Sequence, residues 1–188
     1  MLIQMLVNQP QMLGPVLKNT PLWVWGLLTA LTYLGLSQAK ARTAGLVRVT
    51  FMPVVMTALS LWGTISAFGS SPMFGYVMLA WMFAWAVTLA VIAPMAHARG
   101  TTYDATTRTY SMPGSWVPML LILGIFLTKY VVGVELAMAP NLARDGQYTL
   151  VVGTLYGLFS GIFTGRAARL WRLALRPAGL PTVQVLNT

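Results

Sequence analysis

Two ionisable residues stand inside one long apolar run, and their types and position are the best indication of chemistry in this sequence. Lys129 and Glu135 both fall between Trp116 and Ala139, a stretch long enough to cross a membrane. An ionised side chain in hydrocarbon is costly and usually faces a protein interior or a water-filled cavity. We therefore expect Lys129, near the middle of the run, to serve an anionic solute or a proton path.

The spacing of the two charges does not favour a pair within one helix. At about 100° per residue, their side chains project about 120° apart around the helix axis. Each then needs another partner, so the expected binding site comprises Lys129, Glu135, Tyr130 and Tyr156. The alternative is structural: Lys129 snorkels, or is tied to Glu135 or to a neighbouring helix, and only holds the bundle together.

Other kinds of site have little support in the sequence. There is no cysteine, one histidine, and no Walker A, HExxH or GxSxG motif. His97 and a methionine are ligand types of haem, but His97 stands among basic residues at the end of an apolar run, and methionines in apolar proteins usually fill cores. We expect no metal, no cofactor and no enzymatic activity.

The composition indicates the class of protein before any motif is considered. Of the 188 residues, 57% are hydrophobic and 8% are charged, and the mean hydropathy is +0.71. Apolar runs of about 20 residues recur, and at about 1.5 Å per residue each crosses about 30 Å of hydrocarbon. We expect an all-α membrane protein, a single integral domain over 1–188. Its bundle of about five transmembrane helices is expected at 21–37, 49–68, 73–96, 116–139 and 149–165.

Two segments flank the predicted bundle. Residues 1–19 are apolar but broken by prolines, a glycine and an asparagine, so we expect a short interfacial or re-entrant arm. Residues 166–188 begin with arginines interleaved with leucines, which predicts a basic amphipathic tail on the cytoplasmic membrane surface. The longest polar loop lies between the third and fourth spans, and its alternation over 102–110 is compatible with a small hairpin.

Glycine recurs at every fourth position of the last apolar run, at Gly153, Gly157, Gly161 and Gly165. Positions four apart share one helix face, and glycine costs about 1 kcal/mol relative to alanine within a helix. The glycine ladder therefore predicts a second helix packed very closely against this face. The partner is either the third or fourth span of the same chain or another protomer.

The basic residues predict the orientation in the membrane. The net charge of +9 comes from 12 Lys and Arg against 3 acidic residues. With the amino end outside, most of these charges fall in cytoplasmic loops, as the positive-inside rule requires. Topology thus accounts for them, and nucleic acid is not an expected partner. The expected partners are membrane lipids and either further copies of the chain or another membrane subunit.

Two segments resemble a known family. Residues 40–53, with Arg42 and Arg48 before Pro53, and residues 103–130, which read YDATTRTYSMPGSWVPMLLILGIFLTKY, are similar to a proteobacterial family of small inner-membrane proteins of unknown function. A fainter similarity is to CcdC-type membrane proteins associated with cytochrome c maturation. The resemblance implies the bacterial inner membrane and supplies no catalytic residues. The positive-inside rule, with five spans, predicts a periplasmic N-terminus and a cytoplasmic C-terminus.

Two classes of function remain open. The first is a small transporter or channel-like protein that binds a solute at Lys129, as an oligomer because five short spans enclose little cavity alone. The second is a non-catalytic accessory or assembly subunit whose glycine face and cytoplasmic loop engage partners. The surroundings of Lys129 distinguish the two, since a wet cavity favours transport and dry packing against Glu135 favours an accessory role.

Overall fold

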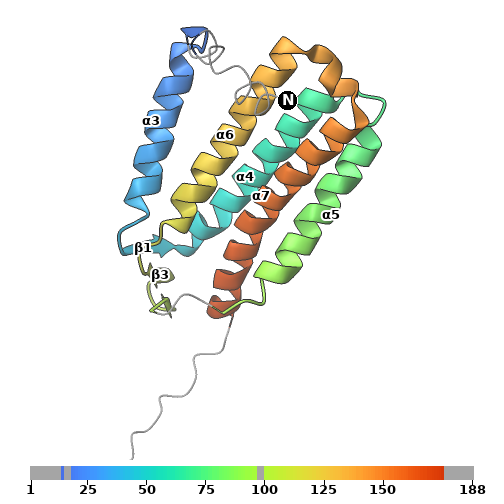
Figure 1. Cartoon of the computed structure of the whole chain (residues 1–188). Coiled ribbons are helices and arrows are strands. Elements are labelled where there is room, and N and C mark those ends of the chain that lie inside the picture. Colours follow the sequence, from blue (N-terminus) through green and yellow to red (C-terminus); the bar gives the residue numbers. More distant parts are fainter. Residues whose placement is uncertain (1–13, 15–17, 97–99, 176–188) are drawn as a thin grey trace, which may run out of the picture.

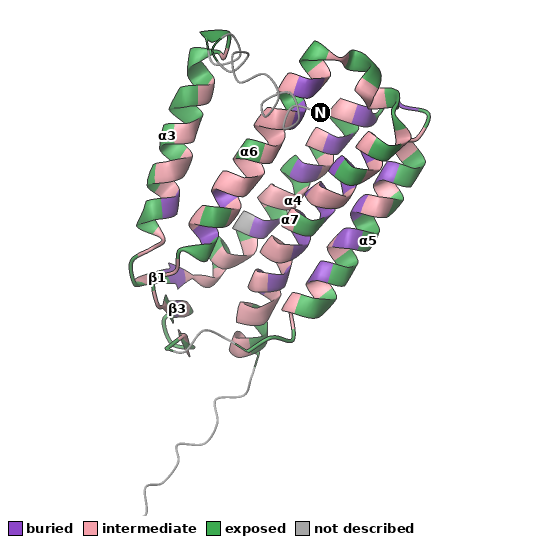
Figure 2. Cartoon of the chain, in the orientation of Figure 1, coloured by how far each residue is buried: buried purple, intermediate pink, exposed green. Residues whose placement is uncertain are grey.

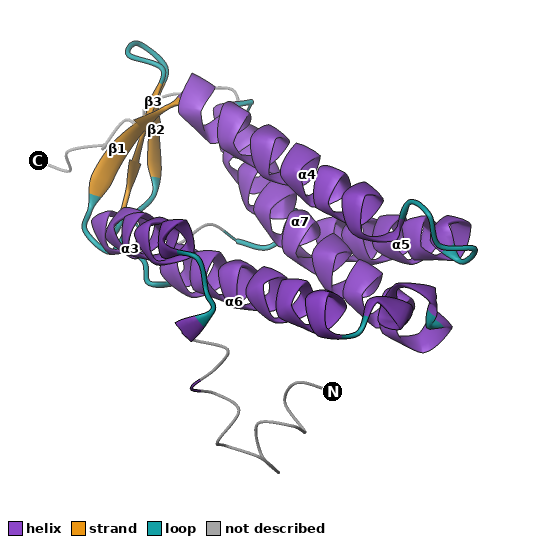
Figure 3. Ribbon diagram, turned by 90° about the horizontal axis from the view of Figure 1, so that it is seen from above, coloured by secondary structure: helices purple, strands orange, loops and turns teal. Residues whose placement is uncertain are grey.

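The computed structural model describes Gly14 and residues 18–96 and 100–175. In this part of the chain five α-helices form a bundle: α3 (Leu22–Ser37), α4 (Leu46–Phe68), α5 (Phe74–Ile92), α6 (Val117–Met138) and α7 (Gly146–Ala174). The 3-10 helix η2 (Pro140–Arg144) joins α6 to α7. Helices α3 and α6 lie side by side in one layer, and α4, α5 and α7 form the other (Figures 1 and 3). The helical class expected from the sequence is therefore observed.

Length separates the first of these helices from the other four. Helices α4, α5, α6 and α7 are each long and apolar enough to cross a membrane. Helix α3 has 16 residues, so it is about 24 Å long, less than about 30 Å of hydrocarbon. Large hydrophobic side chains are exposed along the bundle, including Trp62, Phe83 and Leu120, and exposed positions recur on every helix in Figure 2. The predicted arm over 1–19 lies almost wholly outside the described residues, as does the chain beyond 175.

Helix α7 does not end near Gly165, as predicted, but continues to Ala174. Its first turn is capped by Asp145, whose carboxylate accepts a hydrogen bond of 2.7 Å from the backbone N–H of Tyr148. The residues after Gly165 are mostly alanine, leucine and arginine, which favour helix, and no proline interrupts them before the helix ends. Arg166, Arg169 and Arg172 therefore belong to the helix that contains the glycines.

A three-stranded antiparallel sheet closes one end of the bundle, which we call the sheet end. Strands β2 (Thr102–Asp104) and β3 (Thr109–Met112) form a hairpin within the loop whose alternation was compatible with one, and β1 (Arg42–Gly45) pairs with β3 on its other side. Strand β1 was not expected, because its four residues have no alternation and their partner lies far along the chain. The hydroxyl of Tyr110 in β3 is buried and donates to the carbonyl oxygen of Leu170 in α7 over 3.0 Å.

The glycine ladder faces α5, which is the helix that α7 contacts most extensively. A Cβ atom at Gly157 would overlap the carbonyl oxygen of Trp81, and one at Gly153 would lie 2.8 Å from the Val77 side chain. Real Cβ atoms do not approach other atoms so closely, so α5 has this position only because side chains are missing from α7. The two remaining contacts of the ladder are Gly161 with Trp85 and Thr88, and Gly165 with Ile92.

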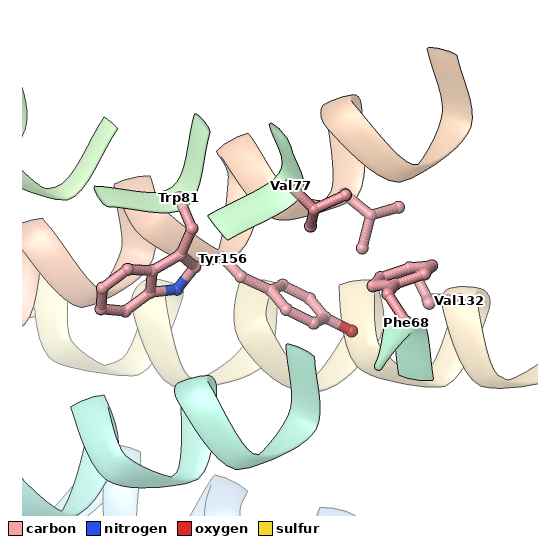
Figure 4. Close-up of a cluster of buried hydrophobic side chains, with 6 residues drawn as sticks. Phe68, Val77, Trp81, Val132 and Tyr156 are labelled. Atoms are coloured by element: carbon pink, nitrogen blue, oxygen red, sulfur yellow. The ribbon is translucent and has the colours of Figure 1, made fainter. Parts of the chain in front are cut away.

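A buried cluster ties α7 to the helices around it. It comprises Phe68, Val77, Trp81, Val132, Val152 and Tyr156. In Figure 4 the ring of Tyr156 lies between Trp81 and Phe68. Trp81 donates from Nε1 to the hydroxyl of Ser60 in α4 over 3.1 Å, and that hydroxyl donates to the Tyr156 carbonyl oxygen over 3.3 Å. One serine thus joins α4, α5 and α7 inside the core.

Candidate functional site

A cavity of about 910 Å³ lies between the α3–α6 pair and helices α4 and α7. Its wall is mainly apolar and is formed by side chains such as Trp23, Leu27, Ile122, Phe126, Phe159 and Phe163. The polar side chains that line it are Asn19, Thr20, Ser60, Lys129, Tyr130, Tyr156 and Ser160. No carboxylate lines the cavity among the described residues, so Lys129 supplies a positive charge to an otherwise uncharged wall.

Lys129 is held at this wall by neighbours from two other helices. Its Nζ atom lies 4.6 Å from the centre of the Tyr156 ring in α7, a cation–π contact. On the α4 side it occupies space left by Gly63, since a Cβ atom at that glycine would be 2.5 Å from Nζ. The ammonium group therefore has a defined position, about half-buried, while one side of it faces the cavity.

Glu135 is in different surroundings from Lys129. Its side chain is 8% exposed, and it is not among the residues that line the cavity. It lies beside Tyr148 of α7 instead. The structure thus separates the two charged residues of α6, as their angular spacing suggested. Of the predicted binding residues, it brings Lys129, Tyr130 and Tyr156 to one cavity and leaves Glu135 outside it.

Tyr130 stands at the edge of the cavity next to α3. Its hydroxyl is 2.6 Å from Oγ1 of Thr20, which precedes α3 in the chain. Its ring stacks on Phe126, one turn earlier in α6, with centroids 6.4 Å apart. Tyr130 therefore connects α6 to the start of α3 and sets the separation of the two helices at this end of the cavity.

Sequence reasoning missed the small residues that shape this site. The absence of a side chain at Gly63 leaves space for Lys129. Gly133 lies on the wall, and a Cβ atom added there would have no other atom within 4 Å. Ser160 also lines the cavity, but its hydroxyl donates to the Tyr156 carbonyl oxygen of its own helix. An isolated glycine such as Gly63 does not indicate which side chain will occupy the space beside it, because that side chain comes from another helix.

His97 lies outside the residues that the structure describes. Within the described part, no three histidine, aspartate or glutamate side chains come together as ligands for a metal ion.

Comparisons with known proteins bear on the family. A family model described as a family of unknown function (DUF6622) matches residues 1–180. Uncharacterized protein PM0739 of Pasteurella multocida (strain Pm70) is 40% identical over 40 residues, which is 21% of this chain and 31% of that relative, so the match spans about a third of the relative. No solved structure matches the chain significantly. The matches agree with the expected resemblance to a family of unknown function and give no support to the CcdC-type likeness.

Proposed function

The chain belongs to the DUF6622 family, and because the function of that family is unknown, we propose one from the geometry of the cavity. The protein is an integral membrane protein that binds an anionic solute with a largely apolar body beside Lys129. It takes part in the transport of that solute across the bacterial inner membrane. The observation behind this function is that the Lys129 ammonium lies on the wall of a large apolar cavity and is not packed against Glu135.

The distribution of basic residues supports a membrane orientation. Among the described residues, the basic side chains near the sheet end are Lys40, Arg42, Arg48, Arg108, Arg166, Arg169 and Arg172. At the opposite end they are Lys18 and Arg144. The positive-inside rule then makes the sheet end cytoplasmic, with the C-terminus, and the opposite end periplasmic, with the N-terminus. In this arrangement α3, which runs alongside α6 in Figure 1, makes the fifth crossing with a locally thinner bilayer or flanking residues compensating for its length.

The cavity wall indicates the chemistry of the solute. An ammonium group on a largely apolar wall gains most from an anion, because a neutral ligand leaves its charge unpaired. The aromatic and aliphatic wall favours an apolar body for the rest of the molecule. The volume of about 910 Å³ is at the upper end of the range of about 300–1,000 Å³ for small-molecule sites. Amphiphilic organic acids fit all three features.

The accessory role has weaker support. Of the two surfaces expected to engage partners, the glycine face and the cytoplasmic loop, the glycine face is already covered by α5 of the same chain. The position of Lys129 on the cavity wall, over the Tyr156 ring, also supports solute binding more than an accessory role.

A binding measurement tests the proposed function. The purified protein in nanodiscs is titrated with a fluorescent fatty acid and, separately, with its uncharged methyl ester, with protein-free nanodiscs as the background. We expect the wild type to prefer the acid. In Lys129→Met we expect the affinity for the acid to fall by about tenfold or more while that for the ester stays the same, since one lost charge pair is worth about 1.4 kcal/mol or more.

Two further variants make this measurement specific. Lys129→Arg keeps the charge and should retain the preference for the acid. Glu135→Gln in the Lys129→Met background should not restore binding, because Glu135 is not on the cavity wall. A well-folded Lys129→Met protein with unchanged affinity and selectivity would reject the cavity as an anion site.

A further inference from the structure

A cluster of arginines at the sheet end has no role in the cavity. Arg42 lies in β1, Arg48 in the first part of α4, and Arg166 and Arg169 in the last part of α7. None of them lines the cavity. Two consecutive elements, β1 and α4, and the distant helix α7 thus contribute guanidinium groups to one region, which we call the arginine cluster.

Hydrogen bonds between the elements hold this cluster together. Strand β1 runs directly into α4, and β1 pairs with β3, whose Tyr110 donates to the Leu170 carbonyl of α7. Trp171 of α7 donates from Nε1 to the hydroxyl of Thr50 in α4 over 3.1 Å. The positions of the arginines are therefore determined by the folded backbone rather than by flexible loops.

The members of the cluster repel one another. Arg42 is half-buried, and its pKa is lowered first by burial and then by the positive charge of Arg48. Arg166 is also half-buried and lies within electrostatic range of Arg169 and Arg42. Arg42 donates one hydrogen bond to Gln38, and within the described part of the chain no acceptor contacts Arg166. Most donors of these two guanidinium groups remain available.

Within the described residues, no acidic side chain is placed against Arg42 or Arg166. The sequence has three acidic residues, and each has another position. Asp104 is on β2, separated from β1 by β3, and accepts hydrogen bonds from Thr106 and Thr107. Glu135 is beside Tyr148, and Asp145 caps the start of α7. Arg42 and Arg166 are half-buried and have no carboxylate beside them in the described part of the chain, and such positive charges are stabilised by an anion from outside the chain.

We propose that the arginine cluster binds a phosphate group, with Arg42 and Arg166 as its two principal ligands. Guanidinium groups bind phosphate through paired N–H donors, and several of them approaching from different elements match its oxygens. With the sheet end at the cytoplasmic surface, as in the proposed function, the group lies at the depth of lipid headgroups. An anionic phospholipid and a soluble phosphate share this chemistry. The positive-inside rule requires only charges on that side, whereas this site also requires their convergence.

Thermal unfolding of the full-length protein in an uncharged detergent tests this site. Phosphatidylglycerol, phosphatidylcholine and inorganic phosphate are titrated in parallel. The variant Arg42→Gln/Arg166→Gln removes two charges from the cluster, and Lys18→Gln/Arg144→Gln removes two from the opposite end as a matched control. We expect phosphatidylglycerol to stabilise the wild type and the control equally, with about tenfold or greater loss of apparent affinity in the cluster variant.

The thermal stability of Arg42→Gln/Arg166→Gln without added lipid or phosphate is a second measurement. Because the arginines repel one another, we expect Arg42→Gln/Arg166→Gln to be at least as stable as the wild type in the absence of anion, whereas a purely structural role would lower its stability. If that variant does not fold, Arg42→Lys/Arg166→Lys keeps both charges but loses the paired donors, and about threefold weaker binding is expected.

The outcomes separate the sources of the phosphate. Stabilisation by phosphatidylglycerol alone identifies a lipid headgroup, and equal stabilisation by inorganic phosphate identifies a soluble ligand. No stabilisation of the wild type by either, or unchanged affinity in the cluster variants, overturns the site. Lys129→Met should leave these responses unchanged, so loss of fatty-acid binding with an intact lipid response would reject the cavity proposal alone.

Discussion

The two sides of helix α7 meet their neighbours in different ways. On one side the residues of the glycine ladder have no side chains. Helix α5 lies so close to them that an added Cβ atom would overlap it. On the other side Tyr156, Phe159 and Phe163 contribute to the wall of a cavity of about 910 Å³ between α7 and the α3–α6 pair. Helix α7 contacts α5 extensively and α6 only sparsely.

This difference shows how one helix can combine rigidity with an open site. Close backbone packing against α5 provides many van der Waals contacts, so α7 has a defined position. The opposite side does not need to pack tightly, and its aromatic residues can line a space and place Lys129. We therefore expect substitutions on the two sides to separate stability from binding.

The largest effect is expected where a side chain is added to the glycine side. Gly157→Ala should destabilise the protein by about 1–3 kcal/mol or more, because its Cβ atom would meet the Trp81 carbonyl oxygen, which cannot move alone. The matched control is Gly124→Ala on α6, where the added Cβ would lie 3.7 Å from the Phe159 ring. That control should be neutral or more stable by up to about 1 kcal/mol. Equal melting temperatures for the two variants would show that the two sides do not differ.

Filling the cavity should affect binding more than stability. Gly133→Leu adds a side chain at a wall position where the Cβ meets no atom within 4 Å, so it enters free space. We expect about tenfold weaker fatty-acid binding in nanodiscs with a melting temperature close to that of the wild type. Gly26→Leu is the control, since Gly26 is an exposed position of α3 with equally open surroundings and is not on the wall. Weaker binding in both variants would indicate a general effect on the helices.

Ser60 connects the two sides, and its removal should affect stability moderately. Ser60→Ala leaves the buried Nε1 of Trp81 without its acceptor and should cost about 1–3 kcal/mol. Ser160→Ala removes a hydroxyl that bonds only within its own helix in the described structure, so a loss below about 1 kcal/mol is expected. Chemical unfolding of both variants measures the difference. A larger loss for Ser160→Ala would place the link between the helices elsewhere.

The smallest effect is expected at Asp104, which lies outside both sides of α7. The hydrogen bonds from Thr107 and Thr106 hold the pKa of Asp104 below its usual value of 3.8. A lowered pKa in the folded state stabilises the protein above the unfolded pKa, and this contribution disappears as the pH falls through the folded value. The wild type should therefore lose a small amount of stability as the pH falls below about 4, and Asp104→Asn should not show this loss. Amide exchange of Thr106 and Thr107 measures it, and exchange on α7 should not change.

The sequence was most informative where the signal is local. The four-residue spacing of the glycines placed them on one face and indicated close packing, because helix geometry alone determines which positions share a face. The position of Lys129 within an apolar helix, and its angular separation from Glu135, followed from the same geometry. The helices α3 to α7 each correspond to an apolar run of the expected range, apart from their ends.

The features that the sequence did not reveal depend on contacts between distant segments. Nothing in the ladder distinguishes α5 from α6 or a second protomer, since each would present an apolar surface. Arg169 and Arg172, in the part of α7 beyond Gly165, donate to the carbonyl oxygens of Ala96 and Ala93, which follow α5 far earlier in the chain. The cavity itself arises from the separation of two helix layers, which no single run of residues encodes.

The pairing of β1 with β3 also has a consequence for biosynthesis. Arg42 pairs with Met112, and the whole of α4 and α5 lies between them in the chain. At about 5–20 residues per second, β1 leaves the ribosome several seconds before its partner strand does. The sheet therefore forms only after α4 and α5 have been synthesised, and until then the backbone donors and acceptors of β1 have no strand partner. The segment before α4 and the segment after α5 are therefore joined by the sheet only after both helices have been synthesised.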